Sequence, residues 1–340
     1  MGIIEARGLA RTFRSRKRTV EAVRGVDLTV GNGEIVGFLG PNGAGKTTTL
    51  RMLTTLLHPT AGMATVAGAD LLRDPVGVRR RIGYVPQAIG QTMGGTDPSC
   101  LVIEELLDQA ALYHLPPADG ARRAETLIGQ LELSGLERRL VKTLSGGQRR
   151  RLEIALGLVH TPALLFLDEP TTGLDPQSRS NLWEHIGALR SELGTTVFLT
   201  THYLEEADVL CDRVFVIDHG VIAAEGTPDD LKRRISGDVV MLRVAEPTSH
   251  HGTGPDARKL LADQPVVREV SSADGTLRLT VEHGDQALPS LLRVLDAAGI
   301  TLESINLSRP TLDDVFLTLT GRSLRDDSPA PAAEGAERAS

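Results

Sequence analysis

The sequence predicts an α/β fold in two domains, with a mostly parallel sheet in the larger domain and an α+β arrangement in the smaller one. Its 340 residues suffice for roughly two domains of about 150 residues each. Short continuous apolar runs alternate with helical segments as far as about residue 234, which is typical of a sheet covered by helices on both faces. After Gly237 the alternation restarts on a smaller scale. We therefore expect a first domain over 1–236 and a second domain over 237–322.

Four apolar runs, each bounded by polar or turn residues, are the expected strands of the larger sheet. They are 34–40 (EIVGFLG), 163–167 (ALLFL), 195–200 (TTVFLT) and 213–217 (RVFVI). Between the first and second of these runs the pattern changes to apolar residues at a spacing of three to four, which predicts a helical insertion over about 88–150. The expected helices of this domain are 47–57, 104–113, 121–133 and 149–159.

The second domain reads as β, α, β, β, α, β, the order of a ferredoxin-like unit. Its expected elements are strand 239–244, helix 256–262, strand 266–270, strand 276–281, helix 286–298 and strand 301–306. A last helix over 312–319 opens after Pro310 and Thr311 and ends before Gly321. Residues 323–340 are rich in Pro, Ala and Ser without periodicity, so we expect a disordered tail there.

Composition and charge exclude several classes of protein. Acidic residues outnumber basic ones, 44 to 37, and the resulting net charge of −7 makes nucleic acid an unexpected partner. No apolar run approaches the ~18 residues that a spanning helix needs, and Glu5 and Arg7 interrupt any apolar signal core. Cys100 and Cys211 form no CxxC pair, so a zinc site is not expected and a reducing compartment suits them.

The first chemical motif is Gly40-Pro-Asn-Gly-Ala-Gly-Lys46-Thr47, which fits the phosphate-cradling pattern GxxxxGK[ST]. It follows an expected strand and precedes an expected helix, as the mechanism needs. Glycines allow backbone N–H groups to face a polyphosphate, and the helix N-terminus adds partial positive charge. Lys46 can then reach the outer phosphates, and Thr47 can ligate Mg²⁺. The alternative is a glycine-rich turn that carries a lysine by chance.

A second motif is the apolar strand Leu164–Asp168, which is followed by Glu169. A strand buried on both faces does not normally finish in adjacent carboxylates unless a cation lies nearby. Beside a phosphate loop that cation is Mg²⁺, which places Asp168 as its ligand and Glu169 as the group that deprotonates the attacking water. The alternative is a strand that simply exits into solvent.

The third motif is Leu144-Ser-Gly-Gly-Gln148, ahead of the helix expected over 149–159. Its glycines offer a second set of free N–H groups at a positive helix end. The chain thus carries two phosphate-seeking helix N-termini, and one nucleotide cannot easily use both within one chain.

With these motifs the sequence resembles the ATP-binding cassette (ABC) ATPases over about residues 3–234. The family's motifs occur here in the family's order: Gly40–Thr47, Gln87 in YVPQ, Leu144–Gln148, Asp168-Glu169, Gly173-Leu174-Asp175 and His202 in TTH. The resemblance implies a P-loop NTPase fold with a RecA-like core, an antiparallel β subdomain and a helical subdomain. It also implies a dimer of two copies stacked head to tail, in which each LSGGQ segment closes over the ATP held by the other copy.

The resemblance assigns roles to individual residues. Lys46 becomes the clamp on the β- and γ-phosphates, Glu169 the catalytic base and His202 the γ-phosphate contact. Thr47, Gln87 and Asp168 become the Mg²⁺ ligands. The residues assigned to ATP binding are Phe13, Gly40, Pro41, Asn42, Gly43, Ala44, Gly45, Lys46, Thr47, Thr48, Gln87, Ser145, Gly146, Gly147, Gln148 and Asp175. Phe13 would stack on adenine, although the basic run at 14–18 lengthens the turn after it and reads as a solvated hairpin tip.

The second domain is similar to that of the daunorubicin-resistance type of exporter ATPase, because it ends in RPTLDDVFLTLTG at 309–321. This resemblance implies an ATPase that lies peripherally on the cytoplasmic face of the membrane and works with a separate ABC-2-type permease. The cargo would be a hydrophobic drug, an antibiotic or a lipid, and residues near 87–97 would contact the permease. Two alternatives stay open: a tail that only stabilises the cassette dimer, and a non-transport ABC ATPase that acts on DNA or the ribosome. An importer ATPase is less favoured.

Overall fold

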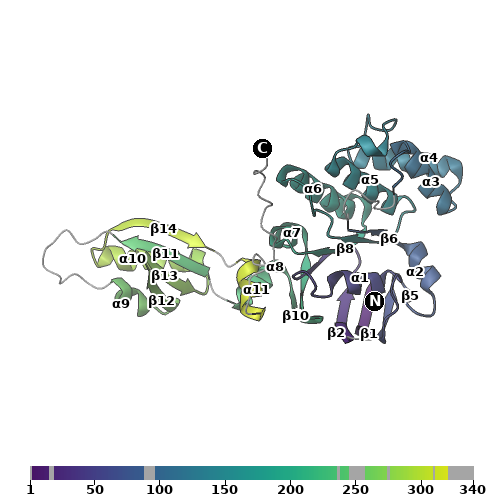
Figure 1. The fold of residues 1–340 in the computed structure, drawn as a ribbon. Coiled ribbons are helices and arrows are strands. Elements are labelled where there is room, and N and C mark those ends of the chain that lie inside the picture. Colours follow the sequence, from purple (N-terminus) through teal and green to yellow (C-terminus); the bar gives the residue numbers. More distant parts are fainter. Residues whose placement is uncertain are drawn as a thin grey trace, which may run out of the picture. The chain divides into compact units, whose positions relative to one another are not determined.

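The computed structural model describes residues 2–14, 19–87, 96–235, 238–244, 257–273, 276–308 and 311–320. These residues form two units, one ending at Thr227 and one beginning at Pro228 (Figure 1). The division falls nine residues before the expected boundary at 236/237. The reason is helix α8 (Pro228–Ile235), which packs against α11 (Leu312–Thr320) of the second unit.

The first unit is built on a six-stranded sheet in the order β10-β9-β3-β8-β7-β6. All neighbouring pairs run parallel except β10 and β9. The strands are β3 (Ile35–Leu39), β6 (Ile82–Val85), β7 (Leu164–Asp168), β8 (Thr196–Thr201), β9 (Arg213–Asp218) and β10 (Val221–Gly226). Every residue of β3, β7 and β8 is buried, as expected from their continuous apolar runs.

Four phenylalanines form the centre of this sheet's core. The ring of Phe198 on β8 lies 5.6 Å from the rings of both Phe38 and Phe166, and Phe38 lies 6.4 Å from Phe215. All four side chains are fully buried and meet at tilted angles, the arrangement that aromatic quadrupoles favour. This packing joins β9, β3, β8 and β7 through side-chain contacts in one core.

A second, antiparallel sheet in the same unit has the order β2-β1-β4-β5. Its strands are β1 (Ile4–Arg14), β2 (Thr19–Val30), β4 (Ala61–Val66) and β5 (Ala69–Asp70). β1 and β2 pair over most of their length as a hairpin. Residues 15–18 of the basic run lie outside the described residues.

The helices of the first unit are α1 (Lys46–Leu53), α2 (Pro75–Arg81), α3 (Val102–Leu112), α4 (Pro117–Gln130), α5 (Gly146–Leu158), α6 (Pro176–Leu193) and α7 (Leu204–Leu210), with a 3₁₀ turn at Val141–Thr143. α3, α4 and α5 contact one another and form the helical insertion (Figure 1). α1 ends before the expected residue 57 because Thr55 adopts a left-handed φ of 64°. Residues 88–95 of the expected permease contact lie outside the described residues.

The second unit contains the βαββαβ order that the sequence predicts. Its elements are β11 (Asp238–Val244), α9 (Ala257–Ala262), β12 (Val267–Ala273), β13 (Thr276–Val281), α10 (Gly284–Ala297) and β14 (Leu302–Ser308). The strands form an antiparallel sheet in the order β12-β13-β11-β14. Val240 and Leu279 of this sheet pack with Leu291 and Leu295 of α10. The expected tail lies outside the described residues.

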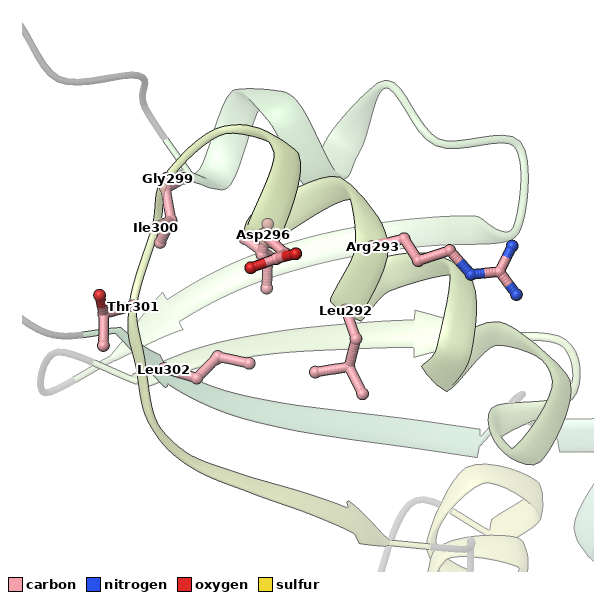
Figure 2. Close-up of a pocket in the computed structure, with 8 residues that line it drawn as sticks. Leu292, Arg293, Asp296, Gly299, Ile300, Thr301 and Leu302 are labelled. Carbon is pink, nitrogen blue, oxygen red and sulfur yellow. The ribbon is translucent and has the colours of Figure 1, made fainter.

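A surface hollow of about 530 Å³ lies in the second unit, where α10 ends and β14 begins (Figure 2). Leu292 and Leu302 give it an apolar side, and Asp296 lies on the helix above them, while the Arg293 side chain extends away from this group. None of the expected site residues belongs to this hollow. Among the described residues, no helix has both the length and the apolar character needed to cross a bilayer.

Candidate active site

The phosphate loop, Gln87, Asp168, Glu169 and His202 meet at the ends of four adjacent strands of the larger sheet. β3, β8, β7 and β6 are neighbours and run parallel, so their carboxyl ends share one edge. Leu39 at the end of β3 pairs with Thr201, and Thr200 pairs with Asp168. The phosphate loop follows β3, Glu169 follows β7, His202 follows β8, and Gln87 comes shortly after β6. In open parallel sheets this edge is where ligands bind.

The phosphate loop needs glycine at position 45 for steric reasons. Gly45 is the N-cap of α1 and has a φ of 108°, a conformation that residues with a side chain rarely adopt. A Cβ atom there would lie 2.6 Å from the carbonyl oxygen of Ala22 on the neighbouring hairpin. The loop therefore turns tightly into the N-terminus of α1, where backbone N–H groups favour an anion. Asn42 and Gly43 are the exposed residues of the loop.

Lys46 is the first residue of α1, and its side chain is buried within the loop. Its Nζ donates hydrogen bonds to the carbonyl oxygens of Gly40 (2.7 Å) and Pro41 (3.0 Å) and lies 3.5 Å from Glu169 Oε1. Burial lowers the pKa of Lys46, and the carboxylate of Glu169 opposes that shift. The ammonium group thus bridges the phosphate loop and the acidic end of β7.

Asp168 is 1% exposed and accepts two hydrogen bonds on the same oxygen, Oδ1. The donors are Thr200 Oγ1 at 2.6 Å and Thr47 Oγ1 at 3.1 Å. Burial raises the pKa of Asp168, and the two hydroxyl groups oppose that shift. A buried carboxylate beside a threonine hydroxyl is a donor set of hard oxygen atoms, which is the kind that Mg²⁺ prefers. Thr47 and Asp168 therefore fit a magnesium ion at this position.

Glu169 has a left-handed backbone, with a φ of 45°, at a cost of roughly 1–2 kcal/mol for a residue other than glycine. Its N–H donates to the backbone oxygen (3.1 Å) and the side-chain hydroxyl (3.0 Å) of Thr200. This conformation turns the carboxylate toward the phosphate loop and β6. Gln87 Nε2 donates to Oε2 at 2.8 Å, and His202 Nδ1 lies 3.2 Å from the same oxygen.

The electrostatic environment keeps Glu169 ionised. Burial by itself raises the pKa of this carboxyl group, but the neighbouring His202 ring, 3.2 Å away, and the positive charge of Lys46 outweigh it and hold the pKa below its usual value. An ionised carboxylate with oriented partners can accept a proton from a water molecule. Gln87 and His202, both predicted as site residues, meet at this carboxylate. A ligand role for Gln87 toward Mg²⁺ stays a prediction.

The LSGGQ segment forms the N-terminus of α5. Ser145 is the N-cap: its Oγ accepts from Gln148 N–H (3.2 Å), and Gln148 Oε1 accepts from Ser145 N–H (3.0 Å). This reciprocal capping box fixes the first turn of the helix. Ser145 and Gly146 are exposed, so the positive end of α5 faces outward. The helix end is therefore accessible to a ligand that another molecule holds.

Two further predicted site residues, Asp175 and Phe13, have identifiable local contacts. Asp175 is the N-cap of α6, and its Oδ1 accepts from Ser178 N–H at 2.9 Å. Phe13 lies near the end of β1, is 40% exposed and packs under the guanidinium group of Arg11 at 4.7 Å. Their roles in ATP binding stay predictions. Among the described residues, no cluster of three or more His, Cys, Asp or Glu side chains could hold a metal ion by itself.

Sequence reasoning missed Glu206, a carboxyl group at full burial on α7. Trp183 of α6, interpreted from the sequence as a packing residue, donates its indole N–H to Glu206 Oε1 at 3.1 Å. Burial raises the pKa of Glu206, which favours the protonated form. The one signal in the sequence was the tryptophan itself, since a buried indole N–H needs an acceptor.

The stability of wild type relative to the Glu206→Gln variant should fall as pH rises. Below the unfolded pKa of about 4.3, the carboxyl group is protonated in both states and burial carries no titration penalty. Above that value only the unfolded chain releases the proton readily, so stability is lost by at most about 1.4 kcal/mol per pH unit up to the raised folded pKa. Glutamine has no such proton. Urea unfolding between pH 5 and 8, followed by fluorescence of Trp183, the single tryptophan, measures the difference.

Glu205→Gln is the matched control, because Glu205 is the preceding residue and is exposed. Its stability relative to wild type should stay constant over the same range. A Glu206→Gln difference that does not change with pH would show that Glu206 is ionised in the folded chain.

Two family models match this chain. The model "ABC transporter" matches residues 23–172, and the model "ATP-binding protein DrrA1-3-like, C-terminal domain" matches residues 226–320. The two matches fall in the two structural units, apart from two residues at the boundary.

Curated relatives match nearly the whole chain. The daunorubicin/doxorubicin resistance ATP-binding protein DrrA of Streptomyces peucetius is 42% identical over 97% of this chain and 96% of its own. The linearmycin resistance ATP-binding protein LnrL of Bacillus subtilis is 36% identical over 91% of this chain and 96% of its own. The Nod factor export ATP-binding protein I of Ralstonia nicotianae is 40% identical, with 92% and 93% covered. These relatives do not favour the alternative of a non-transport ATPase.

Solved structures match about two thirds of the chain. A dimeric post-hydrolysis state of the ATP-binding cassette MJ0796 with ADP and Pi is 25% identical, covers 66% of this chain and 98% of its own, and has a TM-score of 0.59. The cbiO1 protein of Clostridium perfringens, part of the ABC transporter complex cbiONQ, is 28% identical, with 68% and 90% covered and a TM-score of 0.60. The predicted cassette fold is confirmed.

Proposed function

This chain belongs to the ATP-binding subunits of ABC exporters of the daunorubicin-resistance type, and we propose how its site residues use ATP. The chain binds and hydrolyses ATP as the family does. The proposal is that Lys46, Thr47, Gln87, Asp168, Glu169 and His202 form one hydrolytic site. The observation that carries it is the meeting of Lys46, Gln87 and His202 at the carboxylate of Glu169.

In this site the phosphate loop binds the triphosphate through its backbone N–H groups and the N-terminus of α1. Lys46 exchanges the carbonyl oxygens of Gly40 and Pro41 for phosphate oxygens and so places its charge on the β- and γ-phosphates. Thr47 and Asp168 would hold Mg²⁺, with Gln87 as a further ligand. When bound, this ion supplies positive charge that offsets the charge developing on the phosphate oxygens.

Glu169 acts as the general base. Its ionised carboxylate accepts a proton from the attacking water, while His202 and Gln87 fix the orientation of that carboxylate. His202 also contacts the γ-phosphate. The bond from the γ-phosphorus to the bridging oxygen breaks as the water oxygen attacks, so the products are ADP and inorganic phosphate.

The complete site contains two copies of the chain. The N-terminus of α5, at Ser145, Gly146 and Gly147, faces outward. Among the contacts described, none of its N–H groups donates to the phosphate loop of the same chain. We place this helix end on the γ-phosphate held by the other copy, because two positive helix ends then share one polyphosphate. Closure of the two copies depends on ATP, and hydrolysis releases it.

The work of this cycle is outward transport through a membrane permease. Permease partnership is a property of the family. We assign the permease to the ABC-2 type and the cargo to hydrophobic drugs, antibiotics or lipids, because the relatives are named for daunorubicin, linearmycin and Nod factor. The chain then lies on the cytoplasmic face of the membrane and contacts the permease near residues 87–97.

Affinity purification from detergent-solubilised membranes tests this proposal. The tagged chain should recover a protein with several spans of about 20 apolar residues each, and the complex should hydrolyse ATP. Inverted vesicles that contain the complex should take up a hydrophobic fluorescent drug only when ATP is present. Recovery of ribosomes or DNA in place of a membrane protein would overturn the assignment.

Lys46→Ala should weaken ATP binding about tenfold or more, because it removes a charge-assisted hydrogen bond of about 1.5–3 kcal/mol. Titration with a fluorescent ATP analogue measures the dissociation constant, and drug uptake by the vesicles should be lost. Lys142→Ala, at an exposed lysine of the 3₁₀ turn, is the control and should bind ATP normally. Normal binding by Lys46→Ala would mean that the loop is not a phosphate site.

A further inference from the structure

Arg150 is a buried arginine near the start of α5. Its guanidinium group contacts the segment around Glu169 and the segment just before Gln87 in the same chain. The residue is 3% exposed. Nε donates to the carbonyl oxygen of Pro170 at 2.9 Å, and Nη2 donates to that of Asp168 at 3.1 Å. Nη1 donates to the carbonyl oxygen of Pro86 at 2.7 Å and to Glu153 Oε2 at 2.7 Å.

The three carbonyl groups lie next to the residues that do the chemistry. Those of Asp168 and Pro170 flank Glu169 on both sides, so two donors of one rigid guanidinium plane hold the backbone across the left-handed residue. The carbonyl of Pro86 directly precedes Gln87, whose side chain donates to the carboxylate of Glu169. Arg150 therefore contacts the backbone beside both partners of the hydrogen bond between Gln87 and Glu169.

Arg150 also belongs to the helix that begins at Ser145. A helix moves as one rigid element, so a displacement of the LSGGQ end of α5 carries the guanidinium group with it. The next residue, Arg151, contacts Glu132 (3.0 Å) and His185 (3.2 Å) and so joins α5 to the turn after α4 and to α6. Among the contacts described for the three arginines at 149–151, only those of Arg150 reach the segments that contain Glu169 and Gln87.

We propose that Arg150 is a positioning residue for hydrolysis: it fixes the backbone on both sides of Glu169 and at Gln87 relative to α5. Through it, the LSGGQ end that one copy presents to its partner's ATP is mechanically linked to the catalytic base of the same copy. The proposal rests on the roles given above to Glu169 and Ser145. It predicts that loss of the guanidinium fork lowers the rate of hydrolysis far more than it lowers ATP affinity, because the phosphate loop and Lys46, which bind the triphosphate, take no part in it.

Arg150→Lys is the principal variant. Lysine keeps the positive charge beside the buried Glu153, but its point-like ammonium group cannot reproduce a planar fork to three carbonyl oxygens. We expect kcat to fall by about 10- to 100-fold, as for other losses of orientation at a reacting group, with a dissociation constant for ATP within about twofold of wild type. Arg151→Lys is the matched control on the same helix and should change kcat less than about threefold.

A second variant covers the case in which Arg150→Lys folds poorly. Arg150→Gln combined with Glu153→Gln removes both charges of the buried pair and leaves no uncompensated carboxylate. It should show the same pattern: lowered kcat and unchanged ATP affinity. The full-length chain in complex with its permease is used throughout, with Mg-ATP as the ligand, and a thermal melt establishes that each variant is folded.

Wild-type kcat in a folded Arg150→Lys variant would overturn the proposal. So would a loss of kcat accompanied by an equal loss of ATP affinity in both variants, since that pattern indicates a general structural role. Failure of the proposed function has a different result: Glu169→Gln would then retain turnover, whatever Arg150→Lys does. An inactive Glu169→Gln beside a fully active Arg150→Lys refutes only the positioning role.

Discussion

Glu169→Gln should bind ATP, lose turnover and hold two copies of the chain together. Glutamine keeps the size of the side chain and a hydrogen-bonding oxygen for Gln87 and Thr172, but it cannot take a proton from water. General-base catalysis typically contributes about 10²- to 10⁴-fold, so hydrolysis should fall by that factor. With hydrolysis blocked, the ATP between the two copies persists, and the dimer that depends on it persists too.

Light scattering with and without Mg-ATP distinguishes the trapped dimer from the monomer, and phosphate release gives the turnover. Glu184→Gln is the control, because it makes the same chemical change at an exposed residue of α6 outside the site. It should turn over normally and dissociate after hydrolysis. A Glu169→Gln variant with normal turnover would refute the assignment of Glu169 as the base.

The four central strands of the sheet and its chemical edge were predictable because both leave a local trace in the sequence, whereas the outer strands β6 and β10 were not predicted. A strand that is buried on both faces is a short continuous apolar run, so β3, β7, β8 and β9 were placed to within one residue or so at each end. The phosphate loop needs glycine at fixed spacing, because its backbone turns where a Cβ atom would collide. Polar residues that directly follow such strands then fall at one edge.

Features that depend on contacts between distant residues were not predictable. α8 belongs with α11, about eighty residues further on, and only their packing shows that the boundary lies at Pro228. Arg150 is the middle one of three consecutive arginines, and the sequence alone does not show which of them is buried. Its burial depends on carbonyl oxygens of distant segments that accept its hydrogen bonds. The buried carboxyl group of Glu206 likewise depends on a tryptophan from another helix.

Ser145→Arg should abolish hydrolysis and leave the binding of ATP to a single chain intact. Ser145 is exposed at the N-terminus of α5, so its own chain can accommodate the larger side chain without a clash in the core. The bulk of arginine would instead obstruct the close approach of a second copy at the γ-phosphate. Because the rate depends on a helix end from the partner, steady-state turnover should fall by about 10²-fold or more, the usual cost of losing preorganised donors.

Arginine also removes the N-cap, which costs about 1 kcal/mol, so a second substitution is needed to separate capping from the interface. Ser145→Asp keeps an acceptor for Gln148 N–H but places a negative charge against the partner's γ-phosphate, and it should be equally inactive. Ser191→Arg, at an exposed serine near the end of α6, is the matched control and should be active. Full activity in both Ser145 variants would mean that one copy closes its own site, and the second positive helix end would then need another ligand.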